Sequence, residues 1–426
     1  MKTRFKLAFA LLFVLFAAGA LAVPWYSSRA LDAQIKAWAA QPGQGVWQLH
    51  KVAHRAGLFA SSGSAELQFR PRCTSGSEQA PVVLALAYRV SHVPARSGWG
   101  QFTWTLSPSA ATSASFNAIA GLSASGVIGY DGAVSSDMVL PALAWGADLQ
   151  EIRMAASKAQ LRLDGKAATL HWNVDDLELK AKDAALNLHG ARLSLALDDL
   201  ERATGSVALE VDDARTGTVT LQGLQLRNEL HEVSKRLNYQ HSATVQSLQW
   251  MGRTLSDVAL QAKVTGLHAK SVQTLASLFG ETCGFADANA QQTALARQAV
   301  KTLLTTGFSV GIPSLKARDA DSSVSAHLLL ELLPAAQGEV ALAQQLQSSG
   351  EIVVKGGMLT PEQAQLATQS GYVQEVPGGL KMDYRYAAGA LTVGGQPRDA
   401  SMVPVVLARV DSMVNAALMP SGDSER

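Results

Sequence analysis

The chain has 426 residues, of which 47% are hydrophobic and 17% charged, and its formal net charge is +1 at pH 7. This composition is typical of folded globular proteins, and the length accommodates two or three domains or one elongated unit. The balanced charge excludes a strong electrostatic attraction for nucleic acid. The sequence also lacks a basic cluster with interleaved aromatic residues, the pattern typical of nucleic-acid binding.

The first 24 residues predict export to the inner membrane. Lys2, Arg4 and Lys6 precede residues 7–23, an uncharged apolar run of 17 residues. A basic end followed by an apolar run is typical of an export signal whose positive end stays cytoplasmic. At about 1.5 Å per residue the run spans roughly 25 Å, the short end of what a bilayer requires.

Two fates are open to this segment. Ala20-Leu21-Ala22 is a small-x-small site, so cleavage after Ala22 would release a soluble periplasmic protein. Trp25 and Tyr26 favour retention as an anchor, because aromatic side chains prefer the membrane–water interface. We therefore expect a single-pass inner-membrane protein, tethered through residues 7–23, with its bulk in the periplasm.

Residues 25–45 predict a juxtamembrane helix and a linker. Leu31, Ile35 and Trp38 are spaced to share one face of a helix over about residues 26–40. Pro42 and Gly43 then break the helix. Its apolar face rests either on the membrane or on the body of the protein.

Residues 46–268 predict an antiparallel β region. Apolar and polar residues alternate over residues 161–174, and Asp164-Gly165 supplies the positive φ of a hairpin turn. Further short strands follow, with turns expected at Asp175-Asp176, Asp198-Asp199 and Asp212-Asp213. No long helical pattern separates the strands, which favours antiparallel pairing over βαβ units.

Residues 269–426 predict a helical segment, a C-terminal β-hairpin region and a final helix. Helices are expected near residues 272–279, over 290–305, after the N-cap Thr360 and over 404–418. A hairpin should turn near Ala388-Gly389. The expected fold class is α+β and predominantly antiparallel β, with long curved sheets, a few packing helices and a preceding N-terminal transmembrane helix at residues 1–24.

Two passages carry a recognisable pattern. The first is the motif Gly57-Leu58-Phe59-Ala60-Ser61, and the second runs from Gly371-Tyr372 to the hairpin at Tyr384-Arg385-Tyr386 and Gly389 to Gly395. Both resemble the YdgA-like family of bacterial inner-membrane-anchored proteins of unknown function. The chain departs from the family's His-Gly-Pro, since it reads His92-Val93-Pro94. The resemblance implies a β-rich periplasmic body and no active site. From the residues alone, Leu58 and Phe59 are expected to pack inward and Ser61 to join a turn.

Few residues suggest chemistry. His50 and His54 would share a face on a helix, but no third metal ligand accompanies them. Cys73 and Cys283 either form a disulfide in an oxidising compartment or remain two separate thiols. Four aromatic residues either line a ligand groove or pack in the sheet: Trp172, Tyr372, Tyr384 and Tyr386. We expect no catalytic residue, metal site or cofactor.

The expected function is that of a non-enzymatic, membrane-tethered envelope protein, with a lipid or an envelope protein as partner. A one-sided apolar sheet beside an anchor suggests that it handles lipid. The alternatives are a protein–protein scaffold for envelope assembly or motility, and a hydrolase of envelope polymers.

Overall fold

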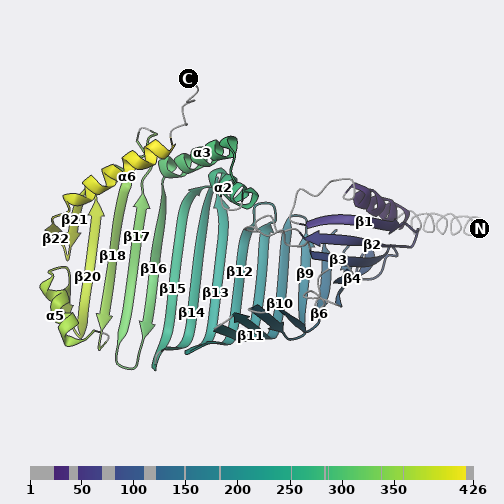
Figure 1. Cartoon of the computed structure of the whole chain (residues 1–426), viewed down its shortest axis with the longest axis horizontal. Helices are drawn as coiled ribbons and strands as arrows, with labels where there is room; N and C mark the ends of the chain where they lie inside the picture. Colours follow the sequence, from purple (N-terminus) through teal and green to yellow (C-terminus); the bar gives the residue numbers. More distant parts are fainter. Residues whose placement is uncertain are drawn as a thin grey trace, which may run out of the picture. The chain divides into compact units, whose positions relative to one another are not determined.

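The computed structural model describes residues 24–37, 47–69, 82–109, 121–147, 150–181, 184–250, 252–282, 285, 287–336, 338–357 and 359–418. The chain separates into two compact units, Met1–Ala185 and Leu186–Arg426 (Figure 1). Each is built on an antiparallel sheet, accompanied by one described helix in the first unit and by several in the second, which confirms the expected α+β class. The boundary falls inside residues 46–268, the stretch predicted as one β region.

The first unit combines one described helix with ten strands. The helix covers residues 24–37, shown in purple in Figure 1. The strands are β1 (Trp47–Arg55), β2 (Ala60–Phe69), β3 (Val82–Ser91), β4 (Gly100–Pro108), β5 (Leu122–Ile128), β6 (Val134–Leu140), β7 (Leu143–Ala147), β8 (Gln150–Met154), β9 (Ser157–Asp164) and β10 (Ala167–Ala181).

These strands pair in the order β1-β2-β3-β4-β5-β6-β9-β10, and all the pairs are antiparallel. The short hairpin β7–β8 continues the ladder along the second half of β10. The predicted helix near residues 26–40 is present. Ile35 is buried, so the apolar face rests on the body of the protein. Trp38 lies outside the described residues.

The second unit continues with twelve strands and five helices among its described residues. The strands are β11 (Ala184–Asp199), β12 (Thr204–Thr216), β13 (Val219–Val233), β14 (Arg236–Trp250), β15 (Arg253–His268), β16 (Phe308–Arg318), β17 (Ser323–Leu332), β18 (Leu346–Lys355), β19 (Gln374–Val376), β20 (Gly379–Ala387), β21 (Ala390–Val393) and β22 (Gln396–Arg398). The helices are α2 (Ala269–Glu281), α3 (Ala290–Thr306), α4 (Leu342–Gln345), α5 (Pro361–Gln369) and α6 (Met402–Leu418).

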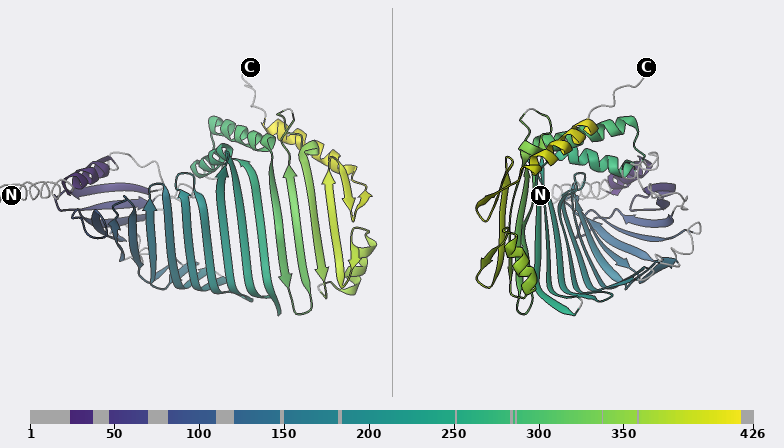
Figure 2. Two further views of the ribbon diagram at one scale, coloured as in Figure 1. Left: turned by 180° about the vertical axis from the view of Figure 1, so that it is seen from behind. Right: turned by 60° about the vertical axis from the view of Figure 1, so that its left-hand side comes forward.

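The strands β11 to β18 pair in chain order, and β20, β21 and β22 follow β18. Helices α2, α3 and α6 lie across one end of the strands, whereas α5 lies at the other end (Figures 1 and 2). The buried Gln345 secures the first end, because its amide nitrogen donates to the carbonyl oxygens of Leu304 at 3.0 Å and Leu333 at 2.7 Å.

Several predicted local features are confirmed. Gly165 has a φ of +59° in the β9–β10 hairpin, and the turn at Ala388-Gly389 joins β20 to β21. Helix α5 begins with the predicted capping box of Thr360 and Gln363. Asp199 ends β11 and accepts hydrogen bonds from the backbone of Glu201 and Arg202.

Two predicted turns are wrong. Asp175-Asp176 lies inside β10 and Asp212-Asp213 lies inside β12, so the strands are longer than expected. A contact with the neighbouring strand stabilises Asp212 within β12, because its Oδ1 accepts a 2.7 Å hydrogen bond from the guanidinium of Arg192 on β11. An Asp side chain that pairs with a cation on the next strand no longer hydrogen-bonds to its own backbone, which is the interaction that favours a local turn.

Among the described residues, no helix combines the length and the hydropathy needed to cross a bilayer. The predicted transmembrane segment, residues 7–23, lies outside them. The same is true of Cys73 and Cys283, so the anchor and the disulfide both stay predictions.

Candidate functional site

A continuous apolar row crosses the sheet of the second unit. The strand registers place nine apolar side chains in line on one face, one from each of nine neighbouring strands. We call them the apolar row: Leu193, Leu209, Leu226, Ala243, Leu260, Leu315, Ala326, Ile352 and Met382. At about 4.8 Å between strands, the eight intervals span roughly 38 Å.

The adjacent residue on each of these strands lies on the opposite face, and seven of these nine residues are polar. In the same strand order, they are Arg192, Glu210, Gln225, Thr244, Ala259, Lys316, Ser325, Val353 and Lys381. The sheet therefore has one face suited to water and one face suited to an apolar partner, as strict alternation requires.

Every side chain of the apolar row is half-buried rather than buried. In-plane neighbours shield each one, but full burial would need a second layer packed over the face. The helices contact the sheet at β15 and β17, and α2, α3 and α6 lie across the strand ends (Figure 2). Within the described second unit, no helix runs along the apolar row.

A few polar groups interrupt this face, and most of them satisfy one another. Asn228 Oδ1 accepts from the Tyr239 hydroxyl at 2.6 Å and lies 2.9 Å from His241 Nδ1. Tyr384 pairs with Ser348 through their hydroxyl groups at 3.1 Å. Because these groups hydrogen-bond to one another, the desolvation free energy is small when an apolar ligand covers them.

A cavity of about 550 Å³ lies beside α5. Val354 and Leu380 line it from β18 and β20, and Leu359, Pro361 and Ala364 line it at and before α5. Val354 and Leu380 lie two positions along their strands from Ile352 and Met382, so the cavity continues the face that carries the apolar row. Its volume is in the usual range for ligand pockets.

The four predicted groove aromatics do not share one cluster. Trp172 belongs to the first unit, where its indole nitrogen donates to the Ser157 hydroxyl at 3.0 Å. Tyr384 and Tyr386 lie on β20, on the face of the apolar row. Tyr372 is exposed after α5 and stacks under the Arg398 guanidinium, 5.5 Å from the ring centroid.

The second candidate centre is in the first unit and involves the family-like motif. Ser61 and His92 are both buried, with Ser61 Oγ 2.7 Å from His92 Nε2. The other ring nitrogen, Nδ1, lies 3.2 Å from Ser27 Oγ, which itself donates to the Pro24 carbonyl oxygen. A neutral imidazole protonated on Nδ1 satisfies the whole chain, because Ser61 then donates to Nε2.

Electrostatics favour the same neutral state. Burial lowers the pKa of His92, and the nearby His54 lowers it further. His54 Nδ1 pairs with the Tyr88 hydroxyl at 2.8 Å. Burial raises the pKa of Tyr88, with a further contribution from Asp32, so its phenol stays protonated at neutral pH.

The motif departs from expectation at its apolar residues. Leu58 and Phe59 were predicted to pack inward, and this is wrong, since both are exposed. Ser61 is a buried residue of β2 rather than part of a turn. The tight β1–β2 connection determines where Leu58, Phe59 and Ser61 lie. A Cβ at Gly57 would overlap the Ala60 carbonyl oxygen, so this bend requires glycine.

His50 and His54 lie on β1 rather than on a helix, with a register irregularity between them. No group of three metal-binding side chains occurs among the described residues. Sequence reasoning did not identify the contact between Ser61 and His92. The signal available was the resemblance, which pairs a serine motif with a His-Gly-Pro motif, from which this chain departs at His92-Val93-Pro94.

Residues 4–360 match a family model described as a bacterial protein of unknown function (DUF945). The chain belongs to this DUF945 family. No curated protein sequence matches the chain. Family membership is thus established over most of the chain and carries no activity with it.

The DUF945 chain therefore offers two arrangements. The apolar row can hold a hydrophobic ligand by burial of nonpolar surface, whereas the adjoining cavity is lined by polar as well as apolar residues. The Ser61–His92 pair is arranged to hold the helix at residues 24–37 against the sheet. A nucleophilic serine would need contact with a substrate and a base oriented by a third group, whereas Ser61 is only 1% exposed.

Proposed function

We propose that the chain is a non-enzymatic, membrane-tethered protein of the periplasmic side of the inner membrane, which holds acyl chains on the apolar face of its second unit. The observation that carries the proposal is the apolar row, which is continuous over nine strands and half-buried at each position. The tether at residues 7–23 and membership of the YdgA-like group are parts of the same proposal.

The dimensions suit acyl chains. The hydrocarbon of one bilayer leaflet is about 15 Å deep, half of a core of about 30 Å. The apolar row, at roughly 38 Å, is more than twice that length. Each methylene that moves from water onto an apolar surface gains up to about 0.8 kcal/mol, so a single chain lying along the row binds without any specific polar contact.

Photocrosslinking tests the proposal with a matched control in the same strands. Benzoylphenylalanine is placed at Leu226 and Leu260 on the apolar row, and at Gln225 and Gln261, their neighbours on the opposite face. After irradiation of the full chain in native membranes, mass spectrometry reads the adducts. We expect lipid adducts at the two leucine positions and none at the two glutamine positions. Equal yields at all four, or none, would contradict the proposal.

A scaffold role is the second candidate, and α6 favours it. Met402, Val405, Val406 and Met413 of this helix are exposed, although the helix also contacts α3 and α4. An exposed apolar helix face is typical of a surface that contacts another protein. Crosslinking from Val405 in membranes should then capture one defined protein, and the absence of such a product would count against this role.

A further inference from the structure

The exposed apolar side chains of the first unit gather at one end of its sheet. The connections β1–β2 (residues 56–59), β3–β4 (92–99) and β5–β6 (129–133) all lie at this end, because neighbouring strands are antiparallel. We call it the loop end. Seven of the nine exposed large hydrophobic residues of this unit's described part lie at the loop end or in the first helical turn beside it, and the two others are Leu49 and Val139.

The loops at this end contact one another. The backbone nitrogen of His92 donates to the Phe59 carbonyl oxygen at 2.8 Å. The Tyr130 hydroxyl donates to the Ala95 carbonyl oxygen at 2.6 Å, and Trp99 meets the Tyr130 ring edge to face at 5.0 Å. These contacts between loops hold the exposed side chains in place at the loop end.

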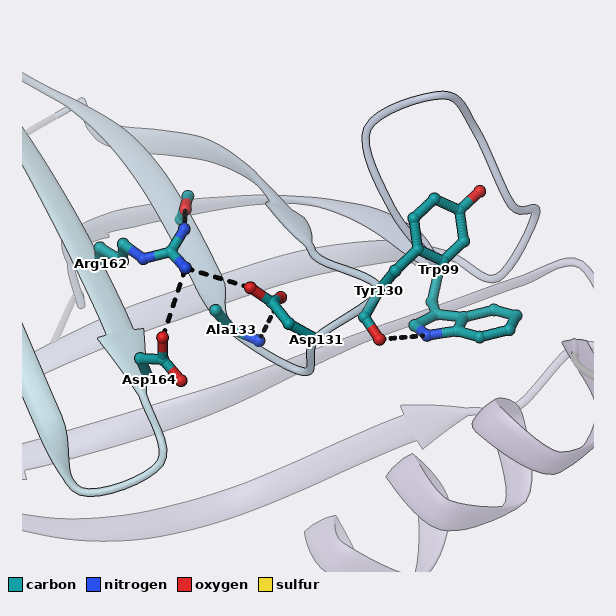
Figure 3. Close-up of polar contacts among 7 residues, drawn as sticks. Trp99, Tyr130, Asp131, Ala133, Arg162 and Asp164 are labelled. Carbon is teal, nitrogen blue, oxygen red and sulfur yellow. Dashed lines mark hydrogen bonds and ion pairs between the residues drawn. The ribbon is translucent and has the colours of Figure 1, made fainter.

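Figure 3 shows how the Trp99–Tyr130 pair is held. The Trp99 indole nitrogen donates to the Tyr130 carbonyl oxygen at 3.2 Å. The next residue, Asp131, accepts a backbone hydrogen bond from Ala133 at 3.0 Å and pairs with Arg162 at 3.2 Å. Arg162 also pairs with Asp164, so the two acidic residues at this end face a cation.

The helix at residues 24–37 starts at the same end. Ser27 in its first turn lies 3.2 Å from His92 Nδ1, and His92 directly follows β3. Trp25 and Tyr26 are 53% and 72% exposed there. The uncharged run of the sequence stops at residue 23, and consecutive Cα atoms are only about 3.8 Å apart. A segment that spans the bilayer through residue 23 therefore holds this turn at the membrane surface.

We infer that the loop end is a bilayer-docking surface, which seats the first unit in the headgroup region of the membrane that residues 7–23 enter. The residues that make it are Trp25, Tyr26, Phe59, Val93, Trp99 and Tyr130. Trp and Tyr favour this region because the ring is apolar while the N–H or O–H stays wet. This inference rests on the proposed tether.

The charge at the loop end complements anionic headgroups. Arg29 stacks on the Trp25 ring at 5.1 Å, and Arg55 and Arg96 are exposed at the end of β1 and in the β3–β4 connection. Basic side chains beside an aromatic belt attract the phosphate groups of lipid headgroups by charge complementarity. A protein partner would also suit a combination of Trp, Tyr and Arg, but it would not explain the position of these residues directly after the apolar run, which favours the membrane surface.

Site-specific photocrosslinking of the full chain in native membranes tests the inference. Benzoylphenylalanine replaces Phe59, Val93 or Tyr130 at the loop end. As controls it replaces Thr103 or Ser125, which are exposed on the polar face of the same sheet. The variants at Phe59, Val93, Thr103 and Ser125 must keep the tryptophan emission of the parent chain, since seven of the eight tryptophans precede residue 186, and the Tyr130 variant must keep the urea midpoint because it contacts Trp99.

We expect phospholipid adducts at the three loop-end positions and no phospholipid adducts at the two control positions. Absence of phospholipid adducts at the loop end, or adducts to a protein instead, would overturn the docking surface. Crosslinking at Phe59 and crosslinking at Leu260 test separate proposals. Lipid adducts at Leu260 without lipid adducts at Phe59 would support the lipid-holding function and contradict the docking surface. The reverse pattern keeps the docking surface and removes the lipid-holding function.

Discussion

Ser61 Oγ lies 2.7 Å from His92 Nε2, and both residues are buried, at 1% and 3% exposure. The two come from neighbouring strands, because Ser61 is in β2 and His92 follows β3. Through Ser27 they also hold the first turn of the helix at residues 24–37. One polar contact thus connects the strand pair to the element that follows the predicted anchor.

Removal of the Ser61 hydroxyl should destabilise the first unit. Ser61→Ala leaves the buried His92 Nε2 without a donor, which costs about 1–3 kcal/mol. Ser62→Ala is the control, because Ser62 is exposed on the same strand and should change stability by less than about 0.5 kcal/mol. Urea unfolding followed by tryptophan fluorescence measures the difference. Equal stability of the two variants would show that the hydrogen bond contributes nothing.

The stability of the first unit should depend on pH through His92. Burial lowers the pKa of His92 in the folded chain, so the unfolded chain binds the proton more readily. The contribution of neutral His92 is complete above the unfolded pKa of about 6.5 and is lost as the pH falls below it toward the lower folded pKa. His92→Gln should flatten this part of the unfolding profile. An unchanged slope between the parent chain and the variant would exclude His92 as its source.

Leu237 on β14 and Leu260 on β15 lie on the same face of the sheet but should respond differently to truncation. Leu237 is 3% exposed, so Leu237→Ala should cost about 2–5 kcal/mol, as for a core leucine. Leu260 is half-buried on the apolar row, so Leu260→Ala should cost clearly less in the lipid-free protein. Hydrogen exchange of the peptides that cover the two strands reports both. Similar losses would mean that the apolar row is covered as fully as a core.

A matched tyrosine pair on β20 separates a satisfied hydroxyl from an unsatisfied one. Within the described residues the buried Tyr386 hydroxyl has no hydrogen-bond partner, whereas Tyr384 pairs with Ser348. Tyr386→Phe should therefore leave stability unchanged or raise it by about 1 kcal/mol, and Tyr384→Phe should lower it by a similar amount. Thermal unfolding of the two variants is the measurement, and a larger loss for Tyr386→Phe would reverse the assignment.

The local features of the fold could be predicted because they depend on neighbours in the chain. Alternation over residues 161–174 indicates a strand pair, and Gly165 indicates its turn, since both follow from the geometry of a few consecutive residues. The capping box of Thr360 and Gln363 lies within four residues in the same way. The turns expected at Asp175-Asp176 and Asp212-Asp213 were wrong because partners on other strands, such as Arg192 for Asp212, outweigh a local preference.

The sequence by itself determined that the chain is mostly antiparallel sheet with one apolar face, because side-chain direction alternates along any strand. Only the tertiary structure decided that Leu193 to Met382 align into one row, because register is a relation between strands. It also decided that Ser61 meets His92 and that Leu58 and Phe59 face solvent. These outcomes depend on residues far apart in the chain, whose proximity is a consequence of the complete fold.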